Sequence, residues 1–282
     1  MKINLLAVFG AIIFFSHGVI APLSFKKTYC CMRCGTNHVM CKYPLPGPGP
    51  ACEQLIQSGL IDADKKMVLD VHNELRNYVA SGKLKQYPAK SANMRELEWD
   101  DELELFAKRH AEQCIPKDES VCCDSIRFRV GQNYAVGRSF TKEKLTTIEQ
   151  HVRNWYHGFN NCGSKKNICT EYTFAYDFTQ MTWGNSYKLG CSYSEFEVSK
   201  LIKNAKVLTN ILICNYAPLG NMRGQTPFVV GEPCSACSNG TKCSEKYPSL
   251  CTANAVRIHP NRKYLFTMAS ISLVLITLKS FI

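Results

Sequence analysis

The chain has 282 residues, and its 34 lysines and arginines exceed its 23 aspartates and glutamates, which gives a formal net charge of +11. The basic residues are scattered among acidic ones and form no stripe interleaved with aromatic side chains, so a nucleic-acid-binding function is disfavoured. The length between the two apolar ends suits one large domain with small appendages rather than two full domains.

Residues 1–21 have the pattern of a secretory signal peptide. Lys2 supplies a positive start, Leu5 to Phe15 form a short apolar region, and small residues follow at Ser16 and Gly18. The segment is too short and wrongly flanked for a spanning helix, although an N-terminal membrane anchor is the alternative. The sequence therefore predicts an extracellular protein.

Residues 22–59 form a cysteine-rich N-terminal arm. The run from Pro44 to Pro50 reads PLPGPGP, which cannot form regular structure because proline lacks a backbone donor and glycine disfavours order. We expect cross-links to hold this arm.

Three helices are predicted in the following domain, which spans residues 60–221. Val68, Val71 and Leu75 recur at helical spacing in the first of them. Asp100 or Asp101 can cap the second, with acidic residues in its positive first turn. The predicted bounds are Asp64–Ala80, Asp101–Gln113 and Thr141–Tyr156, with His151 and His157 of the third interpreted as surface residues.

Strands are predicted at Gly131–Val136, Lys188–Tyr193 and Val207–Tyr216, which are rich in β-branched and aromatic residues. Helices on both faces of a mixed sheet make a fold of the α/β class, a three-layer α-β-α sandwich.

Residues 222–251 follow as a hinge-like knot with four cysteines and almost no apolar side chains. We expect two disulfides to replace a core there, which would make the knot a separate unit. Asn239-Gly240-Thr241 within it is a glycosylation sequon, and a loop is a suitable place for one.

The C-terminal end comprises a linker, residues 252–263, and a hydrophobic tail, residues 264–282. Small residues around Asn254, a polar spacer and a terminal apolar stretch form the pattern of a GPI-attachment signal, with Asn254 as the candidate site. A single transmembrane helix and a tail that is retained and buried are the alternatives. Attachment to a membrane through this tail is expected.

All sixteen cysteines lie outside both apolar ends. An even number in a secreted chain indicates disulfides. Two groups, at Cys30–Cys41 and Cys234–Cys251, could be imagined as zinc clusters, but no matching histidine spacing accompanies them.

Four segments resemble motifs of one family, and they occur in that family's order. His72-Asn73-Glu74-Leu75-Arg76 resembles HNxxR, and Gly131-Gln132-Asn133 resembles a G(E/Q)N strand. The other two segments are Phe178-Thr179-Gln180-Met181-Thr182-Trp183, which resembles FTQMVW, and Cys214-Asn215-Tyr216-Ala217-Pro218-Leu219-Gly220-Asn221, which resembles CNYxPxGN. Together they resemble the CAP superfamily, with its SCP domain, and most of all the insect antigen 5, or venom allergen 5-like, proteins.

The resemblance implies a disulfide pattern. It pairs Cys30 with Cys41, Cys52 with Cys114, Cys191 with Cys214, and Cys34 with either Cys122 or Cys123. Cys31 then takes the remaining one of Cys122 and Cys123, Cys162 and Cys169 close a small loop, and the knot keeps its four cysteines to itself.

Many members of this superfamily have a pocket tetrad of two histidines and two glutamates that can hold a divalent metal. The corresponding positions here are Asp118, Gln132, Gly158 and Asp177, so all four are changed. Two aspartates and an amide do not suit zinc or copper, although Asp118 and Asp177 could hold a hard cation weakly if they were close. We expect no metal and no cofactor.

No catalytic set can be assembled from the motif residues. The resemblance implies that His72, Asn73 and Arg76 are structural, and no Ser–His–Asp arrangement surrounds Thr179 and Gln180. The predicted function is therefore a non-enzymatic CAP binding protein, secreted or tethered, for a lipid or protein ligand that the sequence does not identify. A secreted protease and a channel-modulating toxin acting through the knot are the alternatives.

Overall fold

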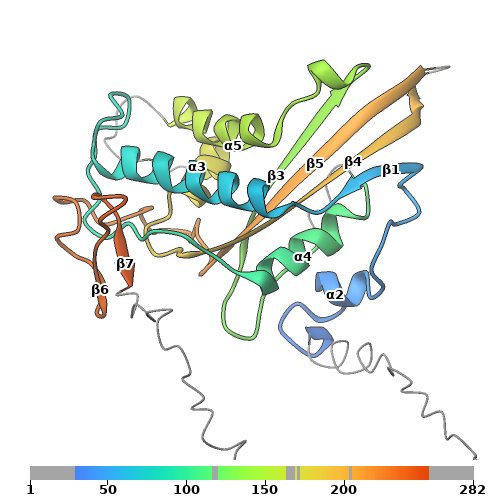
Figure 1. Ribbon diagram of the computed structural model, residues 1–282. Helices are drawn as coiled ribbons and strands as arrows, with labels where there is room; N and C mark the ends of the chain where they lie inside the picture. The colour runs from blue at the N-terminus through green and yellow to red at the C-terminus, as the bar shows by residue number, and fades with distance from the viewer. Residues whose placement is uncertain (1–28, 116–119, 163–168, 170–171, 203–204, 254–282) are drawn as a thin grey trace, which may run out of the picture. The chain divides into compact units, whose positions relative to one another are not determined.

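A sheet of five strands lies at the centre of the computed structural model, which describes residues 29–115, 120–162, 169, 172–202 and 205–253 (Figure 1). The strand order is β1-β4-β5-β3, all antiparallel, and β2 pairs with β4 in parallel. The sheet is therefore mixed, as predicted. Its strands are β1 Gln54–Ser58, β2 Glu98–Trp99, β3 Gly131–Ser139, β4 Lys188–Ile202 and β5 Ala205–Ala217.

Helices cover both faces of this sheet (Figure 1). Successive side chains of a strand point to opposite faces, so each face of the sheet can pack against helices. Ile211 and Ile213 of β5 pack with α4, whereas Leu212 and Cys214 join the larger core formed with the other helices. The predicted three-layer sandwich is confirmed. The helices are α3 Asp62–Ala80, α4 Asp101–Ala111, α5 Ile148–His157 and α6 Tyr172–Met181.

Capping side chains explain where these helices begin. Asp100 accepts a hydrogen bond from the Leu103 amide at 3.1 Å, as predicted for α4. The predicted start of α5 at Thr141 is wrong by seven residues. Thr147 and Gln150 form a capping box that starts the helix at Ile148, and only a short 3-10 turn, Lys142–Lys144, precedes it.

Helix α6 and the sheet strands β1 and β2 are absent from the sequence-based prediction. Helix α6 contains the motif residues Thr179 and Gln180, and its backbone is kinked at Ala175. Strand β1 pairs with β4 and places the end of the arm at the edge of the sheet. The 3-10 turn Gly158–Asn161 links α5 to the segment before α6.

The N-terminal arm packs on α4 through apolar contacts as well as disulfides. Tyr29 stacks on His38 with ring centroids 4.8 Å apart, and both rings meet Phe106 edge-on. The disulfides Cys30–Cys41, Cys34–Cys122 and Cys52–Cys114 fix the arm internally and to the domain. The arm also contains a 3-10 turn, Gly35–Asn37, and the short helix α2, Val39–Lys42.

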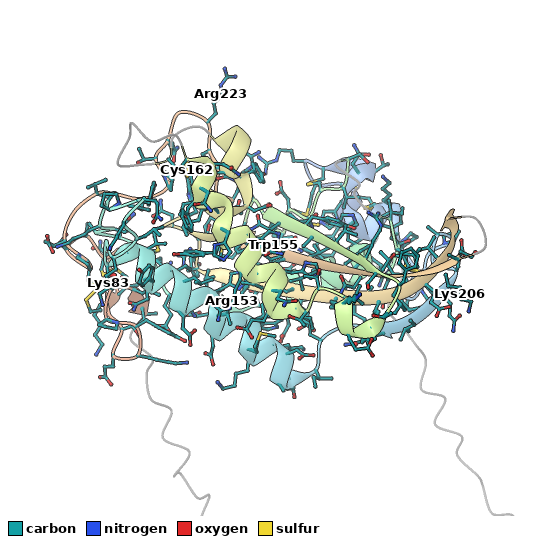
Figure 2. The ribbon with its side chains drawn as sticks, turned by 90° about the horizontal axis from the view of Figure 1, so that it is seen from above. Lys83, Arg153, Trp155, Cys162, Lys206 and Arg223 are labelled. Carbon is teal, nitrogen blue, oxygen red and sulfur yellow. A yellow bond between two sulfur atoms is a disulfide. The ribbon has the colours of Figure 1, made fainter. Side chains whose placement is uncertain are left out.

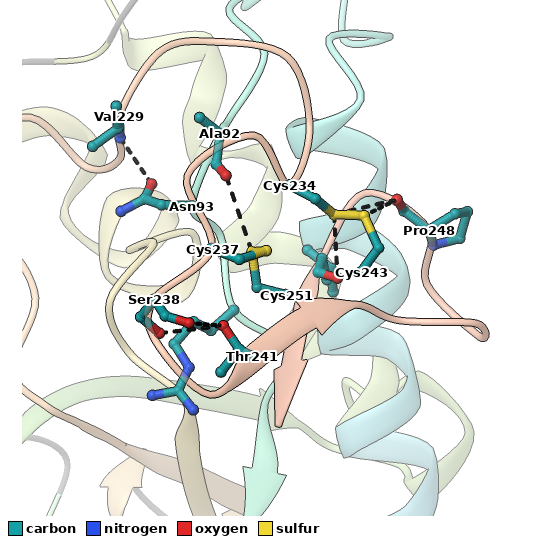
Figure 3. Close-up of a disulfide and its surroundings, with 12 residues drawn as sticks. Ala92, Asn93, Val229, Cys234, Cys237, Ser238, Thr241, Cys243, Pro248 and Cys251 are labelled. Carbon is teal, nitrogen blue, oxygen red and sulfur yellow. Dashed lines mark hydrogen bonds between the residues drawn. A yellow bond between two sulfur atoms is a disulfide. The ribbon is translucent and has the colours of Figure 1, made fainter. Parts of the chain in front are cut away.

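The C-terminal knot is not a separate unit, which corrects the sequence-based expectation. The described residues up to Thr252 form one compact unit. Tyr247 and Leu250 are buried in the main core, and the Ser249 amide donates to Asn77 of α3 at 2.8 Å. Cys234–Cys243 and Cys237–Cys251 close the knot around the short strands β6 Thr241–Cys243 and β7 Cys251–Ala253 (Figure 3).

The two apolar ends of the chain lie outside the described residues, as does Asn254, so the signal peptide and the tail stay predictions. None of the helices in the described part has the length and apolarity needed to span a bilayer.

Candidate functional site

The HNxxR motif lies on α3 and ties that helix to the segments around it. Asn73 accepts from the Leu97 amide at 2.8 Å and donates to the Leu97 carbonyl at 3.0 Å. Arg76 is fully buried and donates five hydrogen bonds to four backbone carbonyls, those of Arg95, Met181, Trp183 and Ser186. These contacts give Asn73 and Arg76 a structural role.

His72 belongs to a buried hydrogen-bonded chain between α3 and the sheet. Its Nδ1 lies 2.7 Å from the Val68 carbonyl, which can only accept, so Nδ1 bears the hydrogen and Nε2 accepts from the Tyr216 hydroxyl at 2.9 Å. Asn133 in turn donates to Tyr216 at 3.3 Å. Burial lowers the pKa of His72 to about 4, so the ring is neutral at physiological pH.

The α6 motif residues are also committed to the fold. The Thr179 hydroxyl donates to the Ala175 carbonyl at 3.0 Å, and Gln180 accepts from the Gly220 amide at 3.2 Å. Gly131 packs against Gln180 so closely that a Cβ there would lie 2.0 Å from the Gln180 Oε1. Trp183 is buried at the end of this motif.

Three of the four tetrad positions lie in the described part of the chain, and Asp118 lies outside it. The Asp177 carbonyl accepts from Asn133 at 2.9 Å, which places α6 beside β3. Gly158 lies against Phe178, since a Cβ added at Gly158 would lie 3.2 Å from the Phe178 Cβ. Gln132 instead donates to Asn215 of β5 at 2.8 Å.

A cavity of about 360 Å³ lies beside Gln132, between the arm and the start of β3. We call it the arm cavity. Its lining includes Val130 and Leu219 as apolar walls, with Arg33 and Arg129 as cations. Arg33 forms an ion pair with Asp124 at 2.6 Å, and Arg129 is exposed. Sequence reasoning from the motifs missed this cavity, although an RFR run lies one residue before the G(E/Q)N motif.

The predicted partner of Cys31 is wrong in the structure. Cys34 pairs with Cys122, while Cys31 is exposed and unpaired on the arm and Cys123 is buried and unpaired in the lining of the arm cavity. The two thiols lie in different environments, and Cys123 contacts Gln132 at 3.5 Å. Burial raises the pKa of Cys123 to about 12, so it is a thiol rather than a thiolate.

The remaining disulfides involve the core. Cys191 of β4 and Cys214 of β5 face each other in register and are bonded, and Cys162 is bonded to Cys169. The implied pairs that remain are thus present in the structure.

His151 is buried, which corrects its interpretation as a surface residue. Its Nε2 donates to the Asn210 Oδ1 at 2.8 Å, and Asn210 also donates to the Tyr193 hydroxyl at 3.0 Å. His157 is exposed, as expected. Burial of this histidine on the sheet side of α5 is tolerated because Asn210 supplies a hydrogen-bond partner for the ring.

The first three motifs and the start of the fourth, Cys214-Asn215-Tyr216, fall within the match to one family. The family model described as the cysteine-rich secretory protein family, CAP, matches residues 69–216. The chain belongs to the CAP family. The CAP family is one of secreted proteins, as its description states.

Curated relatives of this CAP chain include venom proteins. The venom allergen 3 homolog of Dinoponera quadriceps is 35% identical over 201 residues, which cover 68% of this chain and 83% of the relative. The cysteine-rich venom protein of Tityus serrulatus is 34% identical over 239 residues, or 82% of this chain. The CAP chain spans only 54% of the length of that Tityus protein.

Solved structures agree on the CAP fold. The structure titled NaASP2 with Zn²⁺ has a TM-score of 0.51 and 26% identity, and the match covers 73% of this chain and 99% of that one. BmVAL-1 has a TM-score of 0.52 and 26% identity, with coverage of 72% and 98%.

The residues of this CAP protein do not fit the metal tetrad of the superfamily. Gly158 offers no ligand atom, and the Gln132 amide nitrogen is bonded to Asn215. Asp177 is the one carboxylate among the three described positions, whereas zinc sites need three or four nitrogen, sulfur or carboxylate ligands. Two cysteine clusters, Cys34 with Cys122 and Cys234 with Cys237 and Cys251, have their sulfurs in disulfides.

Proposed function

We propose that this chain is a non-enzymatic extracellular binding protein that holds a small amphipathic ligand in the arm cavity. The cavity's volume of about 360 Å³ supports this proposal, because ligand pockets typically have volumes of about 300 to 1,000 Å³. Its lining combines apolar with polar and charged side chains, which suits a ligand that has both kinds of surface. Val121, Val130 and Leu219 would contact the apolar part of the ligand. Arg33 and Arg129 favour a ligand that also has an anionic or polar group.

The alternative, a secreted protease, has less support from the side-chain contacts. A nucleophile needs a base within hydrogen-bond reach. The Thr179 hydroxyl bonds to backbone carbonyls, and His72 bonds to Val68 and Tyr216. The buried Cys123 is protonated and lies against an amide rather than an imidazole. These contacts favour a binding function.

The experiment is a titration of the full chain with fluorescent sterol and fatty-acid probes. We expect saturable binding that Leu219→Gln weakens by about tenfold, because a polar amide in an apolar wall costs about 1–2 kcal/mol. Ile61→Gln is the matched control, since Ile61 is 66% exposed and lies before α3. A small-ligand function would be contradicted if no probe bound, or if both substitutions weakened binding equally. A protein ligand would then be the remaining form of the binding function.

We also propose that the mature protein is glycosylated at Asn239 and tethered through its C-terminal tail. Asn239 is exposed in the knot, and the Thr241 hydroxyl of its sequon donates to the Ser238 carbonyl at 2.6 Å (Figure 3). Release from cells by a GPI-specific phospholipase supports the GPI signal, whereas retention indicates a spanning helix. Asn239→Gln should abolish the mass loss that an N-glycosidase produces.

A further inference from the structure

A second hollow, of about 340 Å³, adjoins the arm cavity and shares Arg33, Asp124 and Arg129 with it. We call it the arginine pocket. Its lining adds Met32, Ile126, Arg127 and Phe128 to the shared residues. Three arginines and three large apolar side chains thus line one hollow, and the proposed ligand of the arm cavity uses only the shared Arg33 and Arg129 among them.

A tight turn presents this pocket to solvent. The Ser125 hydroxyl accepts from the Arg127 amide at 3.1 Å and from the Phe128 amide at 3.0 Å, and the Ser125 amide donates to the Phe128 carbonyl at 2.9 Å. These bonds hold the turn in shape. Ile126 at its tip is 69% exposed. Exposure of an apolar side chain to water is unfavourable in free energy, and contact with an apolar partner would remove it.

The arginines are held in place yet keep free donors. Among the described residues, Arg33 donates from Nη2 to Asp124, and Arg127 donates from Nε and Nη2 to Asp100 and Glu102. A guanidinium has five N–H donors, so each can bind an anion without releasing its carboxylate. The pairing therefore orients both groups before any ligand arrives.

Arg129 is exposed and forms no ion pair among the described residues. The facing carboxylates are Asp100, Glu102 and Asp124, and all three pair with Arg33 or Arg127. Arg33 and Arg127 are also more exposed than the carboxylates they pair with, so the exposed surface of the pocket is basic, although its three arginines and the three facing carboxylates cancel in formal charge.

We propose that the arginine pocket binds the phosphate of an anionic phospholipid at a membrane surface, with Ile126 entering the interfacial layer. Arginine forks match phosphate oxygens, and interfacial binding combines buried apolar area with attraction to anionic lipid. A phosphate free in solution would use the arginines but gain nothing from Ile126, which distinguishes a membrane from a soluble anion.

The test measures binding of the full chain to phosphatidylcholine vesicles with and without phosphatidylserine. The difference between the two vesicle types removes any contribution that the apolar tail makes to both. We expect Arg129→Gln to lower the affinity for phosphatidylserine vesicles by about tenfold. Ile126→Ser should lower it as well, without affecting thermal unfolding.

Arg138→Gln is the matched control. Arg138 is also exposed and lies near the far end of β3, about 25–30 Å along the strand direction from Arg129. Equal losses from Arg129→Gln and Arg138→Gln would overturn the proposal, because the attraction would then be diffuse. The proposal would also be overturned if Ile126→Ser left the affinity for phosphatidylserine vesicles unchanged while inorganic phosphate competed with those vesicles. If vesicles do not bind while the sterol or fatty-acid probe does, this inference fails and the proposed function stands.

Discussion

Replacing Arg76 by lysine should lower the free energy of unfolding by about 3–5 kcal/mol. The guanidinium is fully buried and bonds to carbonyls from two separate segments, and burial lowers its pKa to about 9. A lysine ammonium has three donors on one atom and cannot reach four carbonyls, so several buried acceptors would lose their partners. Breaking such a buried charged network is among the most costly single changes.

Urea unfolding followed by circular dichroism measures this effect, with Arg153→Lys as the control. Arg153 lies on α5 with an exposed side chain (Figure 2) that pairs with Glu149 one turn away, so its replacement should change stability by less than about 1 kcal/mol. A similarly small change for Arg76→Lys would mean that the HNxxR motif does not hold these segments together.

Acid should destabilise the protein through His72. Its folded pKa of about 4 lies below the unfolded value near 6.5, so the unfolded state binds the proton more readily. The contribution of neutral His72 to the free energy of unfolding is complete above pH 6.5 and is lost as the pH falls toward 4. The free energy of unfolding is lower by about 2–3 kcal/mol at pH 4.5. Burial lowers the pKa of His38 and His151 too, which adds in the same direction.

The measurement is the unfolding free energy between pH 7.5 and 4.5 for the wild type and His72→Gln. The variant should start less stable but lose about 2–3 kcal/mol less over this range. His157→Gln, which replaces an exposed ring, should follow the wild-type curve. Parallel curves for wild type and His72→Gln would show that His72 is not the buried acid-sensitive group.

Much of the fold follows from local signals. The apolar spacing of α3 and the aspartate cap of α4 place those helices to within two residues, and the β-branched run of β5 marks the central strand. Helix α6 escapes prediction because its sequence, YTFAYDFTQM, alternates aromatic with smaller residues as a strand would. The start of α5 is readable in Thr147 and Gln150, whose spacing is that of a capping box.

The candidate site is less predictable, because it depends on contacts between distant segments. Motif positions locate Gln132 and Asp177, but they do not indicate that the arm brings Arg33 to within 2.6 Å of Asp124, 91 residues away. The predicted pairing of Cys31 is wrong for a similar reason. Which thiols meet depends on how the arm lies on the domain, and sequence spacing does not specify that.

Hydrogen–deuterium exchange of the full chain, with and without a saturating fatty-acid or sterol probe, tests the ligand-binding role of the arm cavity most directly. The Val130 amide donates to Asp124 and the Leu219 amide donates to the Arg129 carbonyl, so both bonds belong to the cavity wall. We predict slower exchange at these two amides when the probe is bound. Protection confined to other segments, or no protection at all, would contradict a ligand site in the arm cavity.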